Sequence, residues 1–283
     1  MFRSLSNSWE LAKASAAVLR SDKELIVFPI VSAVGSVLVL ATFAAPMFLA
    51  SVFDQLIADG QVRPLGVLVA FLFYLVQYTV IFFANTALVG AAMIRLQGGD
   101  PTIADGFRIA SKRLGAILGY ALISATVGVL LRAISERLGF VGRIVIGLIG
   151  FAWNLATYLV VPVLAAEDIG PLDAIKRSSS LLKRTWGEQV VGNASIGAVF
   201  GLFIVGAIGV GALLIGLGIA AESSAVIILA VIATIVAVLA IGLISATLSG
   251  IYSAAVYRYA AQGEISDGFN ADMIQSAFRS KVA

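Results

Sequence analysis

Two clusters of basic residues, each beside an apolar helical face, are the features of this sequence best suited to bind something. Each cluster lies in a short polar segment between two long apolar runs. Lysine and arginine next to a membrane attract anionic lipid, at about 1 kcal/mol for each cation near the surface. The same cations also serve to set membrane topology, and both roles remain open. Eight positions are predicted to contact lipid or a partner: Arg108, Lys112, Arg113, Lys176, Arg177, Lys183, Arg184 and Trp186.

Neutral polar side chains within the apolar runs form a second group of candidates. They are Gln77, Asn85, Asn154 and Thr157. A polar group in hydrocarbon needs a partner, and a hydrogen bond between membrane helices is worth about 0.6–2 kcal/mol. Helix-to-helix contact is the favoured interpretation, and a ligand site is the alternative.

Two G-x-x-x-G spacings indicate close helix packing. One joins Gly115 to Gly119 and the other joins Gly197 to Gly201. Small residues at this spacing let helix backbones approach one another closely. We expect packing within the chain more than packing against another copy, although the spacing itself fits both.

The sequence lacks the residues and motifs on which several classes of chemistry depend. The chain has neither cysteine nor histidine, which excludes thiol catalysis and removes the commonest metal ligand. No nucleophile motif, phosphate loop or pair of carboxylates is evident. The apolar runs carry no ionisable residue between their ends, which argues against ion-coupled transport. We therefore expect no enzyme activity, no metal and no cofactor. The net charge of +3 is too small to indicate nucleic acid as a partner.

The composition indicates an all-α polytopic membrane bundle in a single domain, residues 1–283. Hydrophobic residues make up 60% of the chain and charged residues only 12%, against about 25% in soluble domains. A membrane-spanning helix needs about 17–25 apolar residues. Six apolar runs meet this length: 25–53, 64–94, 114–131, 144–166, 189–219 and 224–257.

Shorter segments with apolar residues on one helical face alternate with pairs of spans. They cover residues 4–20, 101–113, 171–186 and 265–279, and the second is expected to begin at Asp100-Pro101. The order suggests one amphipathic helix followed by two spans, repeated three times. The alternative, that any bundle with short loops produces similar joints, is equally open.

The positions of the cations predict the orientation. Fifteen of the 19 Lys and Arg lie in the N-terminal segment, the second and fourth connections and the C-terminal tail. The positive-inside rule therefore places both termini in the cytoplasm, in a plasma (inner) membrane. The connection after residue 131 is the exception, because it holds Arg132, Arg137 and Arg143.

The chain resembles an uncharacterised family of six-span prokaryotic membrane proteins. The resemblance is carried by Ser6-Asn7-Ser8-Trp9, by Arg20-Ser21-Asp22-Lys23-Glu24-Leu25 leading to Pro29, and by Trp186-Gly187-Glu188. More distantly, it is similar to membrane domains associated with glycerophosphodiester phosphodiesterases, which have no catalytic motif of their own. Neither resemblance implies a substrate.

These observations favour a non-enzymatic membrane protein that binds membrane lipid or a partner protein through its basic amphipathic helices. The partner would be another membrane protein or a second copy of the chain. The alternative is a transporter or channel for a neutral or lipid-like molecule, with a path along the Gly-rich fifth span and the polar groups at Asn85 and Asn154.

Overall fold

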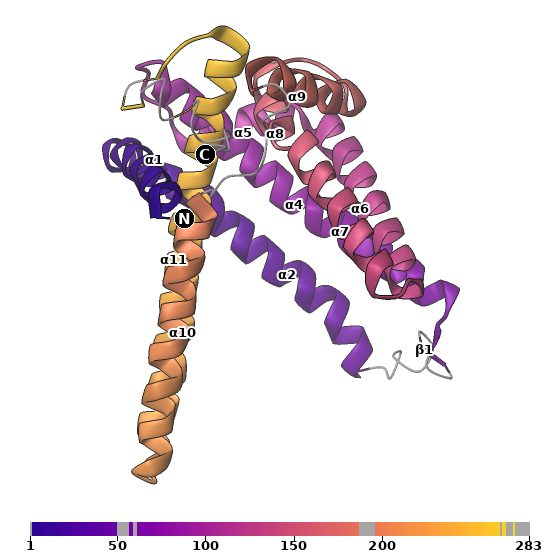
Figure 1. Ribbon diagram of the computed structural model, residues 1–283, viewed down its shortest axis with the longest axis vertical. Coiled ribbons are helices and arrows are strands. Elements are labelled where there is room, and N and C mark those ends of the chain that lie inside the picture. Colours follow the sequence, from indigo (N-terminus) through magenta and orange to yellow (C-terminus); the bar gives the residue numbers. More distant parts are fainter. Residues whose placement is uncertain are drawn as a thin grey trace.

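Six long apolar helices run between the two ends of the molecule (Figure 1). The computed structural model describes residues 2–49, 57–58, 61–186, 196–266, 268–269 and 274. Within these residues, six helical segments are long and apolar enough to cross a membrane, so the all-α multi-pass membrane class is confirmed. The spans are α2 (Val27–Leu49), α4 (Pro64–Leu96), α6 (Leu114–Arg137), α7 (Phe140–Ala156) continued by α8 (Val160–Ala166), α10 (Ile196–Ala220) and α11 (Ser224–Gln262).

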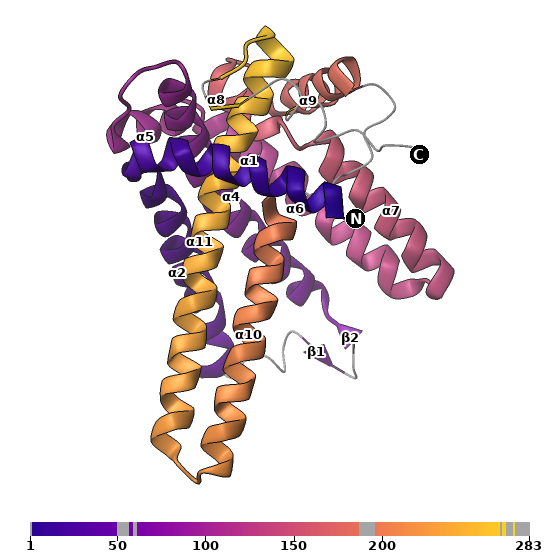
Figure 2. The same ribbon diagram turned by 60° about the vertical axis from the view of Figure 1, so that its left-hand side comes forward.

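Three amphipathic helices gather at one end of the spans, and we call them the collar. They are α1 (Phe2–Ser21), α5 (Ile103–Lys112) and α9 (Pro171–Trp186), and each precedes a pair of spans. A 3-10 helix, η1 (Lys23–Ile26), joins α1 to α2. The opposite end holds the α10–α11 turn and a short antiparallel pair, β1 (Ile57–Ala58) and β2 (Gln61–Val62) (Figure 2). Most of the fourth predicted amphipathic segment, 265–279, lies outside the described residues.

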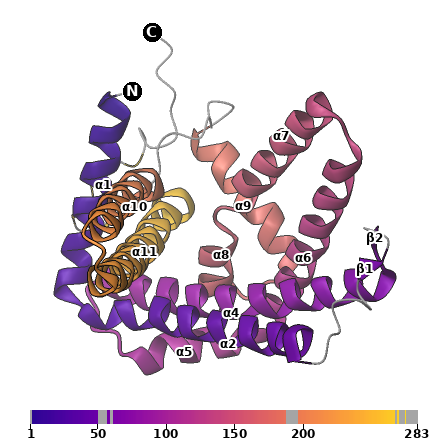
Figure 3. The same cartoon turned by 90° about the horizontal axis from the view of Figure 1, so that it is seen from below.

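The buried core lies at the collar end. Leu11 of α1, Phe28 of α2, Leu88 of α4 and Leu181 of α9 are all almost fully buried. Away from the collar, the α10–α11 pair and the α6–α7 pair stand apart with α4 between them (Figure 3). Large apolar side chains there are exposed, such as Leu213 at 71%. The spans therefore offer much of their apolar surface to lipid.

The fourth span is broken, which differs from the continuous run expected over 144–166. Residues 157–159 form a turn between α7 and α8. Pro162 explains the break, because proline has no N–H and its ring clashes with the carbonyl four residues earlier. Ser178 of α9 is buried against this turn: its hydroxyl accepts a hydrogen bond from the Leu159 N–H at 3.0 Å and donates one to the Ala156 carbonyl at 2.7 Å.

Other helix boundaries follow local capping and charge. The α5 helix begins at Ile103, later than the predicted Asp100-Pro101, because Thr102 is its N-cap. The α6 helix continues to Arg137, beyond the predicted end at residue 131. The chain turns between the last two spans at Glu222, whose φ of 51° is left-handed.

Candidate functional site

The start of α5 holds the first basic cluster in place through a capping box. The Thr102 hydroxyl accepts from the Asp105 N–H at 3.2 Å, and the Asp105 carboxylate accepts from the Thr102 hydroxyl at 2.7 Å and N–H at 3.0 Å. These hydrogen bonds from Thr102 hold the pKa of Asp105 below its usual range. Arg108 donates to the same carboxylate at 2.8 Å. One cation of this cluster is therefore already held by a carboxylate of its own helix.

The arginines of the collar connect its parts. Arg113, at the start of α6, forms an ion pair with Asp168 just before α9. Arg177 of α9 donates to Glu167 at 3.0 Å, and Arg184 of α9 donates to the carbonyl of Ala260 on α11 at 3.2 Å. These three predicted contact residues are thus used largely within the fold.

Glu167 binds side chains from two helices, α9 and α11, beside the second basic cluster. The Tyr257 hydroxyl of α11 donates to the same Glu167 oxygen that Arg177 binds, at 2.9 Å. The carboxylate therefore connects the end of α8 to both α9 and α11. We interpret this group as a structural joint, because its partners are all side chains of the chain itself.

The lysines of the collar point outward. Lys112 and Lys183 are exposed, and the side chain of Lys176 is 78% exposed although it pairs with Asp173 one turn away. Such pairs on a helix surface contribute only about 0.3–0.5 kcal/mol. Lys176 therefore remains available to an outside anion. The side chain of Trp186 lies outside the described part of the structure.

The four intramembrane polar residues differ in burial and in hydrogen bonding. Thr157 is buried at the break of the fourth span, and its hydroxyl donates to the Trp153 carbonyl at 2.8 Å. Asn154 is exposed on α7, whereas Asn85 is partly buried on α4. The Gln77 side-chain oxygen is buried with no hydrogen-bond partner among the described residues. Transport along a path that these residues line remains a prediction.

The two glycine motifs have different surroundings. A Cβ atom at Gly119 would lie 2.7 Å from the ring of Pro171, so α6 approaches the start of α9 closely at this point. A Cβ atom at Gly115 or Gly201 would meet no atom within 4 Å, and Gly197 is exposed. Among Gly115, Gly119 and Gly201, whose surroundings the structure describes, Gly119 has the close approach within the chain that the motifs predicted.

Two arginines outside the predicted set also have defined partners. Arg258 on α11 is buried and donates to the Leu96 carbonyl at the end of α4 and to the Ser266 hydroxyl. Arg132 on α6 lines a cavity and pairs with Glu136 at 2.9 Å. Both arginines could have been noticed in the sequence, because each is a charge at the end of an apolar run. Arg258 follows the sixth run and Arg132 follows the third.

A comparison with known protein families shows which family the chain matches. Residues 64–268, from the start of α4 to just beyond α11, match a family of unknown function, DUF6159. The chain belongs to this family. Membership in DUF6159 confirms the resemblance to an uncharacterised family and assigns no substrate. The more distant likeness to glycerophosphodiester phosphodiesterase membrane domains remains a prediction. A search of curated proteins finds no match to the chain.

Proposed function

We propose that this DUF6159 protein is a non-enzymatic membrane protein that binds anionic lipid through its collar. The observation that carries the proposal is the exposure of Lys112, Lys176 and Lys183 on amphipathic helices at the ends of the spans. Helices of this kind lie at the level of the lipid headgroups. Their exposed ammonium groups are therefore at the right depth to meet lipid phosphates.

The carboxylates of the collar support a role in binding without catalysis. Asp105 and Glu167 are each bound to an arginine, and their side chains are only 28% and 25% exposed. A general acid or base needs access to the proton that it moves. Carboxylates paired in this way serve the fold.

We infer that the collar faces the cytoplasm. Fifteen of the 19 cations belong to segments on the collar side of the spans by sequence. Short cytoplasmic connections are enriched in Lys and Arg, and the cytoplasmic leaflet carries the negative surface potential. In this orientation the exposed lysines meet the leaflet that attracts them.

Neutralising the three exposed lysines of α5 and α9 tests the proposal. At about 1 kcal/mol for each cation, Lys112→Gln, Lys176→Gln and Lys183→Gln together should weaken binding of phosphatidylglycerol by roughly a hundredfold. Native mass spectrometry of the full chain, extracted in mild detergent and titrated with this lipid, measures the change.

A matched variant controls for net charge. Arg63, Arg137 and Arg143 are exposed cations at the end opposite the collar. Their replacement by Gln removes the same charge and should leave most phosphatidylglycerol binding in place. Equal losses in both triple variants would contradict the proposal. Loss of a co-purifying protein without loss of lipid would assign the collar to a protein partner instead.

A further inference from the structure

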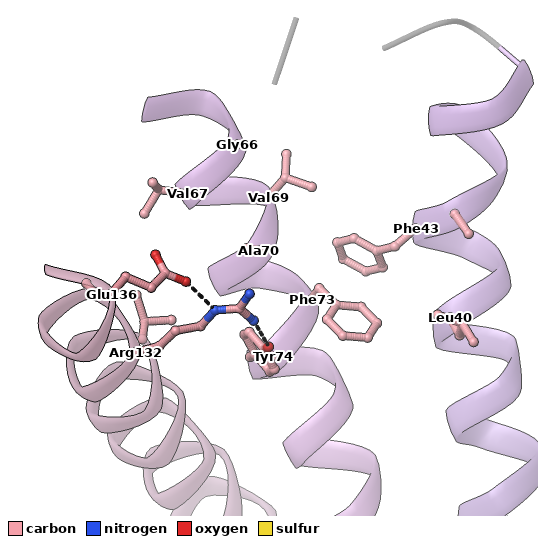
Figure 4. A pocket seen from close by; sticks show the side chains of 13 residues that line it. Leu40, Phe43, Gly66, Val67, Val69, Ala70, Phe73, Tyr74, Arg132 and Glu136 are labelled. Carbon is pink, nitrogen blue, oxygen red and sulfur yellow. Dashed lines mark hydrogen bonds and ion pairs between the residues drawn. The ribbon is translucent and has the colours of Figure 1, made fainter. Parts of the chain in front are cut away.

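A cavity lies between α2, α4 and α6 at the end of the spans opposite the collar (Figure 4). Its volume is about 430 Å³, which lies within the range of roughly 300–1,000 Å³ that is usual for small-molecule sites. Ten of its thirteen lining residues are apolar or glycine. The aromatic rings of Phe43 and Phe73 lie with their centroids 5.5 Å apart, edge to face, and line its α2 side. The cavity is therefore suited to the apolar part of a ligand.

The other lining residues form a polar edge. Arg132 Nε donates to Glu136 at 2.9 Å, and Arg132 Nη1 donates to the Tyr74 hydroxyl at 3.3 Å. In Figure 4, the Arg132 guanidinium extends from α6 toward Tyr74 on α4. Two of the five guanidinium N–H groups are used in these bonds, which leaves three to donate elsewhere. The side chains of Arg132 and Glu136 are 69% and 64% exposed, so both can reach a ligand.

The depth of this edge matches a lipid headgroup. An α-helix rises 1.5 Å per residue, so Arg132 stands about 27 Å along α6 from Leu114 at the collar end. The hydrocarbon core of a bilayer is about 30 Å thick. The backbone of Arg132 therefore lies near the far edge of the hydrocarbon core, and its long side chain extends to the headgroup layer on the side away from the collar. In the sequence, Arg132 begins the connection after residue 131, which is the exception to the positive-inside rule because it holds three cations.

We propose that this cavity binds a phospholipid with a phosphate and a primary ammonium, such as phosphatidylethanolamine. The free N–H groups of Arg132 donate to the phosphate, a geometry that guanidinium groups favour. The ammonium donates to the exposed carboxylate of Glu136. The upper part of an acyl chain lies in the apolar cavity against Phe43 and Phe73.

The balance of charge at the edge selects this headgroup. Arg132 and Glu136 are one cation and one anion a helical turn apart. An anionic lipid without an ammonium would leave two anions, its phosphate and Glu136, to share the single cation of Arg132. A quaternary ammonium satisfies the charge of Glu136 but has no N–H to donate. The site thus differs in chemistry and in position from the collar lysines.

The test uses the full chain in detergent, stripped of lipid and titrated separately with phosphatidylethanolamine, phosphatidylglycerol and phosphatidylcholine. In the background of the triple lysine substitution, which removes most collar binding of phosphatidylglycerol, native mass spectrometry should show phosphatidylethanolamine bound about tenfold better than either of the others. A hydrogen bond to a charged group contributes about 1.5–3 kcal/mol, so Arg132→Gln and Glu136→Gln should each weaken its binding by at least about tenfold. Ala70→Leu fills the cavity without a change of charge and should also weaken binding, which keeps the test valid if a charge variant unfolds.

Arg137→Gln is the matched control, because Arg137 neighbours Glu136 on α6 but does not line the cavity. It should bind phosphatidylethanolamine as the native chain does. Equal binding of the three lipids by the triple lysine variant would overturn the proposal, as would equal affinities of the Arg132→Gln and Arg137→Gln variants for phosphatidylethanolamine. The triple lysine variant of the collar should keep the preference for phosphatidylethanolamine, so failure here and failure of the proposed function are distinguishable.

Discussion

At the scale of single residues, Ser178 supplies two hydrogen bonds that the fourth span cannot make for itself. The break before Pro162 leaves the Leu159 N–H and the Ala156 carbonyl without helical partners, and the Ser178 hydroxyl binds both. Irregular backbone at membrane depth persists only where other groups of the protein satisfy it. Ser178 thereby couples a collar helix to a membrane span.

Ser178→Ala should lower the free energy of unfolding by about 1–3 kcal/mol for each buried backbone group left unpaired. Chemical unfolding in detergent, followed by circular dichroism, measures this loss. Ser180→Ala is the matched control on the same helix, because Ser180 is exposed and its hydroxyl donates only to the Arg177 carbonyl. It should change stability by less than about 0.5 kcal/mol. Equal losses would refute the role of Ser178.

At the scale of elements, α5 packs against α2 and α4 through a residue without a side chain. A Cβ atom at Gly106 would lie 2.8 Å from the Ala87 carbonyl oxygen of α4 and still closer to the Phe28 ring of α2. The carbonyl belongs to helix backbone and cannot move aside without disturbing α4. Glycine at this position therefore determines how closely the collar approaches the spans.

Gly106→Ala should destabilise the protein by about 1–3 kcal/mol, the usual cost of overpacking a tight contact. Gly115→Ala should instead be neutral or stabilising by up to about 1 kcal/mol, because a Cβ atom there meets nothing within 4 Å and alanine favours helix. Thermal unfolding of both variants in the same detergent gives the comparison. A stabilised Gly106→Ala variant would show that α5 can shift away from α4 at little cost.

At the scale of the whole molecule, large buried side chains are concentrated at the collar end, while the α10–α11 pair stands apart from the other spans at its far end. Leu88 of α4 is fully buried, whereas Leu213 of α10 is 71% exposed. Lipid chains are about as apolar as leucine, so side chains facing lipid contribute little to holding helices together. The collar, with its buried side chains and ion pairs, therefore determines the arrangement of the spans.

The same substitution at the two leucines should have very different effects. Leu88→Ala should cost about 2–5 kcal/mol because it opens a cavity in the core. Leu213→Ala should stay within about 0.5 kcal/mol, since no packed neighbour loses contacts. The free energies of unfolding of both variants, measured under identical detergent conditions, provide the comparison. Comparable losses would mean that the ends of α10 and α11 are packed against something more than lipid.

The sequence by itself determined the class, the spans and the order of the collar helices. Apolar run length, helical periodicity and capping are local properties, so the six spans, the α10–α11 turn at Glu222 and the amphipathic α5 and α9 could be predicted. Local signals also explain one wrong boundary. The capping box of Thr102 and Asp105 is stronger than the start expected from Asp100-Pro101.

Only the tertiary structure decided which polar groups meet. Ser178 is 19 residues from Leu159, and Arg113 pairs with Asp168 from a different connection. Such partners depend on how helices pack and not on the composition of either segment. For the same reason, spacing shows Arg132 and Glu136 on one face of a helix, but only the approach of α2 and α4 turns that face into the edge of a cavity. Lysine and arginine carry the same charge in the sequence, whereas the structure pairs Arg113 and Arg177 with carboxylates and leaves Lys112 exposed.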